Sequence, residues 1–189
     1  LYAGTSLLLF EDTLVFEARS KTEIQVKNTG DAKLYISRLR RLFEELGGTL
    51  PGVLAGSFIT PTVENCRIVK MQDTGILAEF DGKVKAVIGT AAYMVSKGIT
   101  IPDENDARLQ RSRKDTVLLY AAFDGELKLI FEIEYGVHAE FRENVPGLIE
   151  YGIATGIYTS DPMLNDRFAA AERSRNSRRA ALGKREHRI

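Results

Sequence analysis

The chain has little of what marks several large classes of protein. Its 189 residues include one cysteine, Cys66, and no tryptophan. A single cysteine excludes a disulfide framework and indicates a reducing compartment. Lysine plus arginine and aspartate plus glutamate both number 26, so the net charge is zero. A neutral chain lacks the basic field that attracts nucleic acid, and we therefore expect no nucleic-acid partner.

Long hydrophobic runs are also missing. No segment approaches the roughly 18 consecutive apolar residues of a membrane-spanning helix, and we find no signal-peptide pattern. The chain begins with Leu1 instead of methionine. We therefore expect a soluble piece of a longer protein, whose membrane segments would lie outside these residues. Apolar residues make up 44% of the chain, so a core can form.

The first third of the chain predicts two strands and a helix. Leu7–Phe10 is a short apolar run typical of a buried strand, and residues 22–27 alternate like a half-exposed strand. Apolar residues recur at helical spacing from residue 34 to residue 46, and Gly47-Gly48 ends this helix. Residues 49–62 contain glycine and proline without periodicity, which predicts a loop or a broken helix.

A β-rich block follows. Two hairpins are predicted, because Asp81-Gly82 and Asp124-Gly125 each separate two short apolar runs. Between the hairpins we expect a short helix at residues 90–97 and a charged, exposed loop at residues 102–115. The expected strands are Cys66–Met71, Gly75–Phe80, Lys83–Ile88, Thr116–Phe123 and Glu126–Ile133.

The last part of the chain has an α/β pattern. A helix kinked near Pro146 is predicted at residues 138–150, and a strand at residues 153–158 runs into Thr159-Ser160-Asp161. Small hydroxyl groups and a carboxylate directly after a strand are how an α/β fold builds a phosphate and metal pocket at the carboxyl edge of its sheet. Residues 162–172 can form another helix. The basic residues 173–189 are either a solvated terminal helix or a contact for an acidic lipid surface or partner domain.

Three stretches, taken in order, resemble the large cytoplasmic loop of P-type cation-transporting ATPases, above all the heavy-metal-transporting class. Gly75–Met94 is similar to the family's hairpin followed by an Ile-Gly-Asn turn and a methionine, with Thr90 in place of the asparagine. Residues 116–133 are similar to the next hairpin of that family. Gly152–Asp161 is similar to the strand that ends in the family's Thr-Gly-Asp motif, with Ser160 in place of the glycine.

The resemblance implies a fold and a domain organisation. We expect an α/β protein in which a partial, parallel haloacid-dehalogenase-like sheet carries an inserted, antiparallel, β-rich nucleotide-binding-like domain. Residues 1–20 and 134–172 would form the incomplete phosphorylation-like domain, residues 21–133 the insertion, and residues 173–189 a basic tail. The resemblance further implies ATP and Mg²⁺ as cofactors, membrane-spanning segments of the same parent as partners, and a place on the cytoplasmic face of a membrane.

The family's catalytic aspartate lies in Asp-Lys-Thr-Gly-Thr, directly after the first strand. Here Glu11 takes the acceptor position, Asp12 takes that of the lysine, and Thr13 matches. Glutamate is one methylene longer than aspartate, and an error of about 1 Å in placement can slow phosphoryl transfer by on the order of 100-fold. We therefore predict a degenerate acceptor motif at these residues. The alternative is that Glu11 and Asp12 are surface acids at the end of a strand.

The remaining site residues follow from the same resemblance. Thr159 and Asp161 match the Thr-Gly-Asp motif, and Asp161 with Glu11 would hold the metal; the alternative is a helix cap after a strand. Gly75, Gly89 and Thr90 would contact the nucleotide in a shallow groove, although a lone glycine in a hairpin is also an ordinary turn residue. We expect the loops carrying Glu11 and Asp161 to converge at one sheet edge.

These residues leave several functions open. One is a catalytically degenerate pump-like domain that serves a membrane parent as a ligand-binding, regulatory or structural module, and this is the interpretation that we favour. A second is a fragment of an active ATP-dependent cation transporter. A third is a soluble α/β protein that binds a phosphorylated small molecule, and a fourth is an interaction domain that uses its basic tail. Enzymatic activity and oligomeric state stay open at this point.

Overall fold

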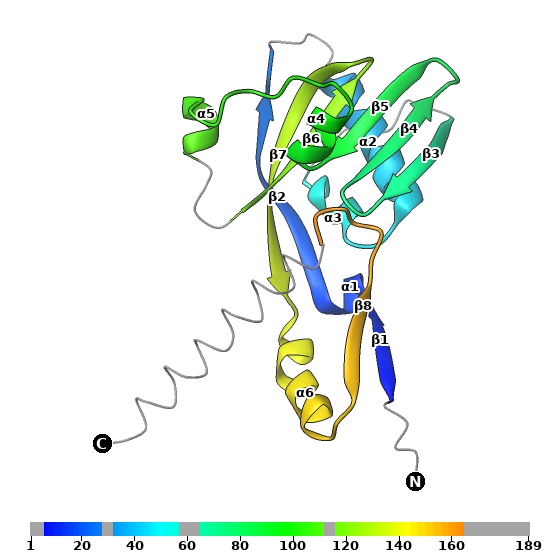
Figure 1. Ribbon diagram of the computed structural model, residues 1–189, viewed down its shortest axis with the longest axis vertical. Coiled ribbons are helices and arrows are strands. Elements are labelled where there is room, and N and C mark those ends of the chain that lie inside the picture. Colours follow the sequence, from blue (N-terminus) through cyan, green and yellow to red (C-terminus); the bar gives the residue numbers. More distant parts are fainter. Residues whose placement is uncertain (1–5, 28–31, 57–64, 112–115, 165–189) are drawn as a thin grey trace.

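Two sheets organise the part of the chain that the structure describes, which comprises residues 6–27, 32–56, 65–111 and 116–164 (Figure 1). In this computed structural model, the larger sheet is antiparallel, with its six strands in the order β2-β7-β6-β5-β4-β3. The smaller sheet has two parallel strands, β1 and β8. The predicted fold class, a small parallel sheet with a β-rich antiparallel insertion, is confirmed.

The larger sheet is built from two tight hairpins and a long closing strand. Asp81 and Gly82 in the first hairpin turn, and Asp124 and Gly125 in the second, all have positive φ angles, which two-residue turns between twisted strands require. Its strands are β2 (Phe16–Gln25), β3 (Cys66–Gln72), β4 (Gly75–Phe80), β5 (Val84–Gly89), β6 (Val117–Phe123) and β7 (Glu126–Val137).

Helices cover both faces of this sheet (Figure 1). On one face lie α2 (Ala32–Leu46) and the single turn α3 (Leu50–Val53), and on the other lie α4 (Ala91–Ser96) and the single turn α5 (Ala107–Gln110). The first face buries the larger cluster, in which apolar side chains of α2 meet those of β4, β5, β6 and β7. A second, smaller cluster lies under α4 and α5.

Local signals place the ends of the helices. Gly47 and Gly48 follow α2 with φ angles of 68° and 64°, so the predicted glycine stop is confirmed. Thr90 caps α4 by accepting a hydrogen bond from Tyr93 N at 3.2 Å. The sequence predicts irregular structure where α3 and α5 lie. A helix of four residues is too short to show a helical periodicity in the sequence. Among the described helices, none is long and apolar enough to cross a membrane.

The smaller sheet pairs β1 (Leu7–Glu11) with β8 (Ala154–Tyr158), and Glu11 lies opposite Tyr158. One of its faces is covered by α6 (Ala139–Glu150), where the rings of Phe10 and Phe141 meet edge to face at 5.1 Å. The strand at residue 7 was predicted to be buried, and this prediction is wrong.

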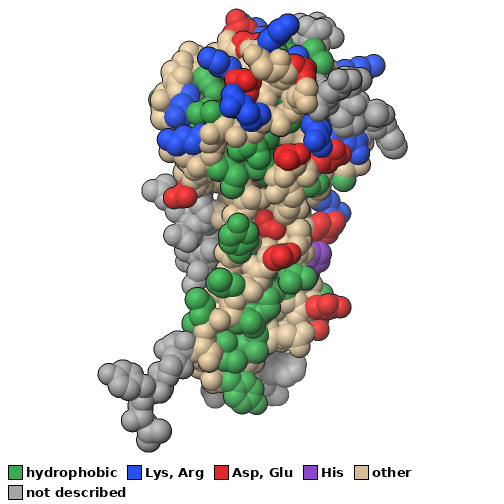
Figure 2. Space-filling view, turned by 90° about the vertical axis from the view of Figure 1, so that its right-hand side faces the viewer, with side chains coloured by type: hydrophobic (Ala, Val, Ile, Leu, Met, Phe, Trp, Pro, Cys, Tyr) green, Lys and Arg blue, Asp and Glu red, His purple; other side chains and the backbone are tan. Residues whose placement is uncertain are grey.

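The side chains on the other face of the smaller sheet are open to solvent. Leu7 is 63% exposed and Leu9 is 61% exposed, because β1 has one neighbouring strand and α6 covers only the opposite face. Figure 2 shows apolar side chains over the narrow lower part of the molecule and charged ones concentrated over the upper part. The predicted helix at residues 162–172 lies outside the described residues beyond Leu164, and the basic tail lies wholly outside them.

Candidate functional site

The carboxyl ends of the two parallel strands bring two distant segments together. Asp12 begins the short turn α1 (Asp12–Val15) after β1, and Thr159 follows β8. Thr159 Oγ1 donates a hydrogen bond to Asp12 Oδ2 at 2.6 Å, although 147 residues separate them. Asp12 is 3% exposed. The expected convergence of the two loops at one sheet edge is therefore what the structure shows.

Asp161 is held by protein groups on both of its carboxylate oxygens. Its Oδ2 accepts hydrogen bonds from Tyr135 Oη at 2.6 Å and from Thr49 Oγ1 at 2.8 Å. Its Oδ1 accepts one from Met163 N at 2.9 Å. Asp161 is 3% exposed, so the carboxylate has exchanged water for three protein donors. These donors come from the loop after α2, from β7 and from the turn that follows β8.

Burial dominates the electrostatics of this cluster. The pKa of Asp161 is raised, first by burial and to a lesser degree by the nearby charge of Asp12, while its bonds to Tyr135, Met163 and Thr49 act in the opposite direction. The pKa of Tyr135 is raised well above its usual value by burial, by the charge of Asp161 and by its bond to that carboxylate. Both shifts favour keeping a proton in the cluster.

The loop after α2 closes over the two carboxylates. A β-carbon at Gly48 would lie 2.8 Å from Asp12 Oδ2, and the φ angle of +64° also disfavours a side chain there. Ser160 Oγ donates a hydrogen bond to Leu46 O at 3.3 Å. Glycine at position 48 thus allows the end of α2 to approach the buried acids closely.

The residues predicted to carry phosphoryl transfer do not all line one site. Asp12 and Asp161 lie in the buried cluster, whereas Glu11 and Thr13 are exposed. The described residues contain no group of three or more His, Cys, Asp or Glu side chains that could hold a metal ion. Because both oxygens of Asp161 already accept bonds from the protein, the arrangement does not fit Mg²⁺, which needs several free oxygen ligands.

Two of the predicted nucleotide contacts have a packing reason to be glycine. A β-carbon at Gly75 would lie 2.0 Å from the ring of Tyr93, and one at Gly89 would lie 2.4 Å from Thr74 O. The hydroxyl of Thr90 is used to cap α4. The ring of Tyr93 therefore fills the space beside these glycines, where we expected a shallow groove. Contact with a nucleotide through these residues stays a prediction.

A pocket of about 480 Å³ lies elsewhere, at the edge of the larger sheet. It is lined by β2 and by the segment around α5, and it includes the buried Glu132 of β7. The lining includes the basic groups of Lys21, Arg108 and Arg111 and the carboxylates of Glu23 and Glu132. Three basic and two acidic side chains line this pocket, so it is not a uniformly basic anion site.

Sequence reasoning missed Thr49, Tyr135 and Gly48. The bonds of Thr49 and Tyr135 to Asp161 span 112 and 26 residues, and no local pattern encodes pairings over such separations. One weak signal was present, because Thr49 follows the Gly-Gly pair that ends α2 and so begins a new segment close to that end. A glycine pair at a helix end shows where the chain turns, but not what it turns toward.

Comparisons with known proteins find similarity among solved structures, at the level of the fold. No protein-family model and no curated protein matches the chain. The catalytic domain of the CPx-ATPase CopB-B matches with a TM-score of 0.50 at 11% identity, over 91% of this chain and 57% of that one. The N-domain of HMA8, a copper-transporting P-type ATPase, matches with a TM-score of 0.40 at 16% identity, over 61% of this chain and 98% of that one.

The crystal structure of a zinc-transporting PIB-type ATPase also matches, with a TM-score of 0.44 at 17% identity. That match covers 88% of this chain, which spans only 27% of the transporter's length. At these identities the similarity concerns the fold alone. The chain has the fold of the cytoplasmic domains of P-type ATPases, as the resemblance in its motifs implies.

Proposed function

We propose that this chain is a catalytically degenerate headpiece that resembles those of P-type cation-transporting ATPases and belongs to a membrane parent. It acts on the cytoplasmic face as a ligand-binding, regulatory or structural module. We expected residues 1–20 and 134–172 as its incomplete phosphorylation-like part, residues 21–133 as the inserted part and residues 173–189 as a basic tail. Because β2 and β7 belong to the larger sheet from Phe16 to Val137, we place the two boundaries at residues 15–16 and 137–138. Membrane-spanning segments of the same parent are its partners.

This proposal rests on the residue at the acceptor position and on its surroundings. Glu11, the residue aligned with the catalytic aspartate, is exposed, and no Lys-Thr-Gly-Thr sequence follows it. Thr159, which would face a phosphoryl group, donates its hydrogen bond to Asp12 instead. Phosphoryl transfer depends on placing nucleophile, metal and phosphate together, and a carboxylate in the place of the lysine repels the phosphate.

The sheet topology distinguishes this proposal from the alternative of a soluble α/β protein that binds a phosphorylated small molecule. Such a protein would be expected to carry one continuous sheet with its ligand at the carboxyl edge. Here the antiparallel strands form a sheet of their own, and the parallel pair is separate from it. The two buried acids at the parallel edge also disfavour a phosphate there.

The test is phosphorylation of the intact chain by ATP labelled on its γ-phosphate, in the presence of Mg²⁺, followed by an acid quench. We expect no covalent label, and we expect the Glu11→Gln variant to behave like the wild type. A label that is stable in acid, is released by hydroxylamine and disappears in Glu11→Gln would show an acyl-phosphate and an active transporter fragment. Titration of the same sample with ATP alone measures whether the chain binds a nucleotide at all.

A further inference from the structure

Two strands cross side by side from one sheet to the other. The chain enters the larger sheet at Phe16, directly after α1, and leaves it at Val137, just before α6. The crossings are bonded to each other, because Phe16 pairs with Val137 and His138 N donates to Val15 O at 3.0 Å. Hinges between protein segments consist of a few residues at the ends of elements, and this pair has that form.

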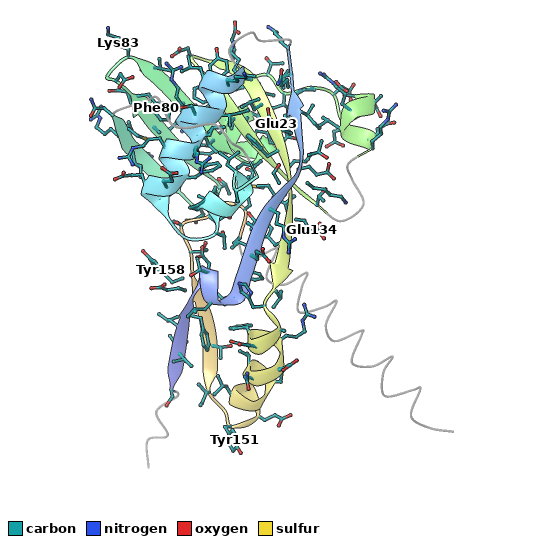
Figure 3. The ribbon with its side chains drawn as sticks, turned by 180° about the vertical axis from the view of Figure 1, so that it is seen from behind. Glu23, Phe80, Lys83, Glu134, Tyr151 and Tyr158 are labelled. Atoms are coloured by element: carbon teal, nitrogen blue, oxygen red, sulfur yellow. The ribbon has the colours of Figure 1, made fainter. Side chains whose placement is uncertain are left out.

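A third connection lies away from that pair. After β8 the chain turns back toward the larger sheet, and Met163, 5% exposed, joins the core beneath α2. Asp161 lies two residues before Met163. It accepts hydrogen bonds from Thr49, which follows α2, and from Tyr135 on β7. In Figure 3, Tyr158 marks the end of β8, and Glu134 marks the part of β7 that carries Tyr135. A hinge with a third fixed point cannot bend freely.

We propose that Thr49, Tyr135 and Asp161 form a metal-free clasp that holds the smaller sheet against the larger one in a single orientation. The inference rests on the proposed function, because a headpiece without phosphoryl transfer does not need to open and close around a nucleotide. In this clasp two side-chain hydroxyls and one backbone N–H occupy the carboxylate positions that a metal ion would otherwise use.

The clasp is sensitive to loss of any single donor. Asp161 is deeply buried, and removing one partner leaves a carboxylate oxygen without the water that it would have in solution. Asp12 lies in the same cluster and adds negative charge, so it cannot compensate for a donor that Asp161 has lost. Tyr135 has a second structural role that Thr49 lacks. Its ring packs edge to face on Phe16, with 6.4 Å between the ring centroids.

The experiment measures the distance between the far ends of the molecule. Spin labels are attached to cysteines introduced at Lys83, in the exposed turn between β4 and β5, and at Tyr151, 87% exposed beyond α6, with Cys66→Ser removing the native thiol (Figure 3). The clasp variants are Thr49→Val and Tyr135→Phe. The matched control is Thr116→Val, which removes a threonine hydroxyl that donates to the buried Glu132 at 2.9 Å within the larger sheet.

We expect one narrow distance distribution for the wild type, with the same width with and without Mg²⁺. The clasp variants should show a second, displaced population that is about tenfold larger than in the wild type, since a buried hydrogen bond to Asp161 is lost. Thr116→Val should keep the single narrow distribution whatever its effect on stability. Far-UV circular dichroism checks folding, and Thr49→Val alone decides the result should Tyr135→Phe fail to fold.

Two outcomes overturn the clasp. One is a wild-type distribution that is broad without Mg²⁺ and narrows when Mg²⁺ is added, which would assign the junction to a metal. The other is a pair of folded clasp variants with the same narrow distribution as Thr116→Val. Failure of the proposed function is a separate result, because it appears as phosphate label on Glu11 and does not depend on these distances.

Discussion

The two sheets of this molecule are stabilised to very different extents. The antiparallel sheet is covered on both faces, and the fully buried side chains of its core include Phe43, Phe80 and Phe131. The parallel pair is covered by α6 on one face only, and α6 has no buried residue. Parallel sheets in proteins are normally covered on both faces. The difference indicates that the larger sheet folds on its own core, whereas the smaller one depends on the junction that ties it to the larger.

The largest expected effect comes from truncating one apolar side chain in each sheet. Phe131→Ala removes a fully buried ring from β7, and we expect the free energy of unfolding to fall by about 3–5 kcal/mol. Leu9→Ala truncates a side chain that is 61% exposed on β1, and we expect a change within about 0.5 kcal/mol. Urea denaturation measures both values. Equal losses of unfolding free energy in the two variants would contradict the claim that the larger sheet is the more strongly stabilised.

A pair of glycine substitutions sharpens the same contrast. Gly75→Ala places a methyl group against the ring of Tyr93, so we expect a loss of about 1–3 kcal/mol from overpacking. Gly147→Ala in α6 meets nothing within 4 Å, and alanine in a helix interior should stabilise by about 0.5–1 kcal/mol. Thermal denaturation followed by circular dichroism reports both signs. A stabilising Gly75→Ala would show that Tyr93 packs elsewhere.

The junction should have a pH dependence of its own, smaller than these effects. Because the pKa of Asp161 is higher in the folded chain than in the unfolded chain, its contribution to stability is fully present below the ordinary aspartate pKa and declines as pH rises through the raised value. The stability of the wild type relative to Asp161→Asn should therefore decrease from about pH 4 upward. Urea midpoints of both proteins across a range of about pH 4–8 test this sign, and a rising difference would contradict it.

Much of the fold can be predicted from local signals, and the reasons are specific. Asp-Gly at residues 81–82 and 124–125 fixes both hairpins, and Gly47-Gly48 ends α2, because these residues adopt positive φ at low cost. The strand limits are less well predicted. β2 begins six residues before the alternating pattern at Thr22, since its pairing with β7 continues to Val137.

The candidate site is only half predictable. The order of the motifs places Asp12 and Thr159 at one sheet edge, since parallel strands meet at their carboxyl ends. The partners of Asp161 could not be found, because Thr49 and Tyr135 reach it only after the larger sheet has packed on α2. Exposure of β1 was mispredicted for a related reason. An apolar run indicates that a strand can be buried, but whether other elements cover it depends on the tertiary fold.

The most direct test of a metal-free junction between the two sheets is denaturation of the intact chain by urea at a series of Mg²⁺ concentrations. A metal that binds the folded state alone, at about 100 times its dissociation constant, would raise the free energy of unfolding by roughly 2.7 kcal/mol. We expect the same urea midpoint at every Mg²⁺ concentration, because the carboxylate of Asp161 already accepts hydrogen bonds from Thr49, Tyr135 and Met163. A midpoint that rises with Mg²⁺ in the wild type and stays constant in Asp161→Asn would contradict it.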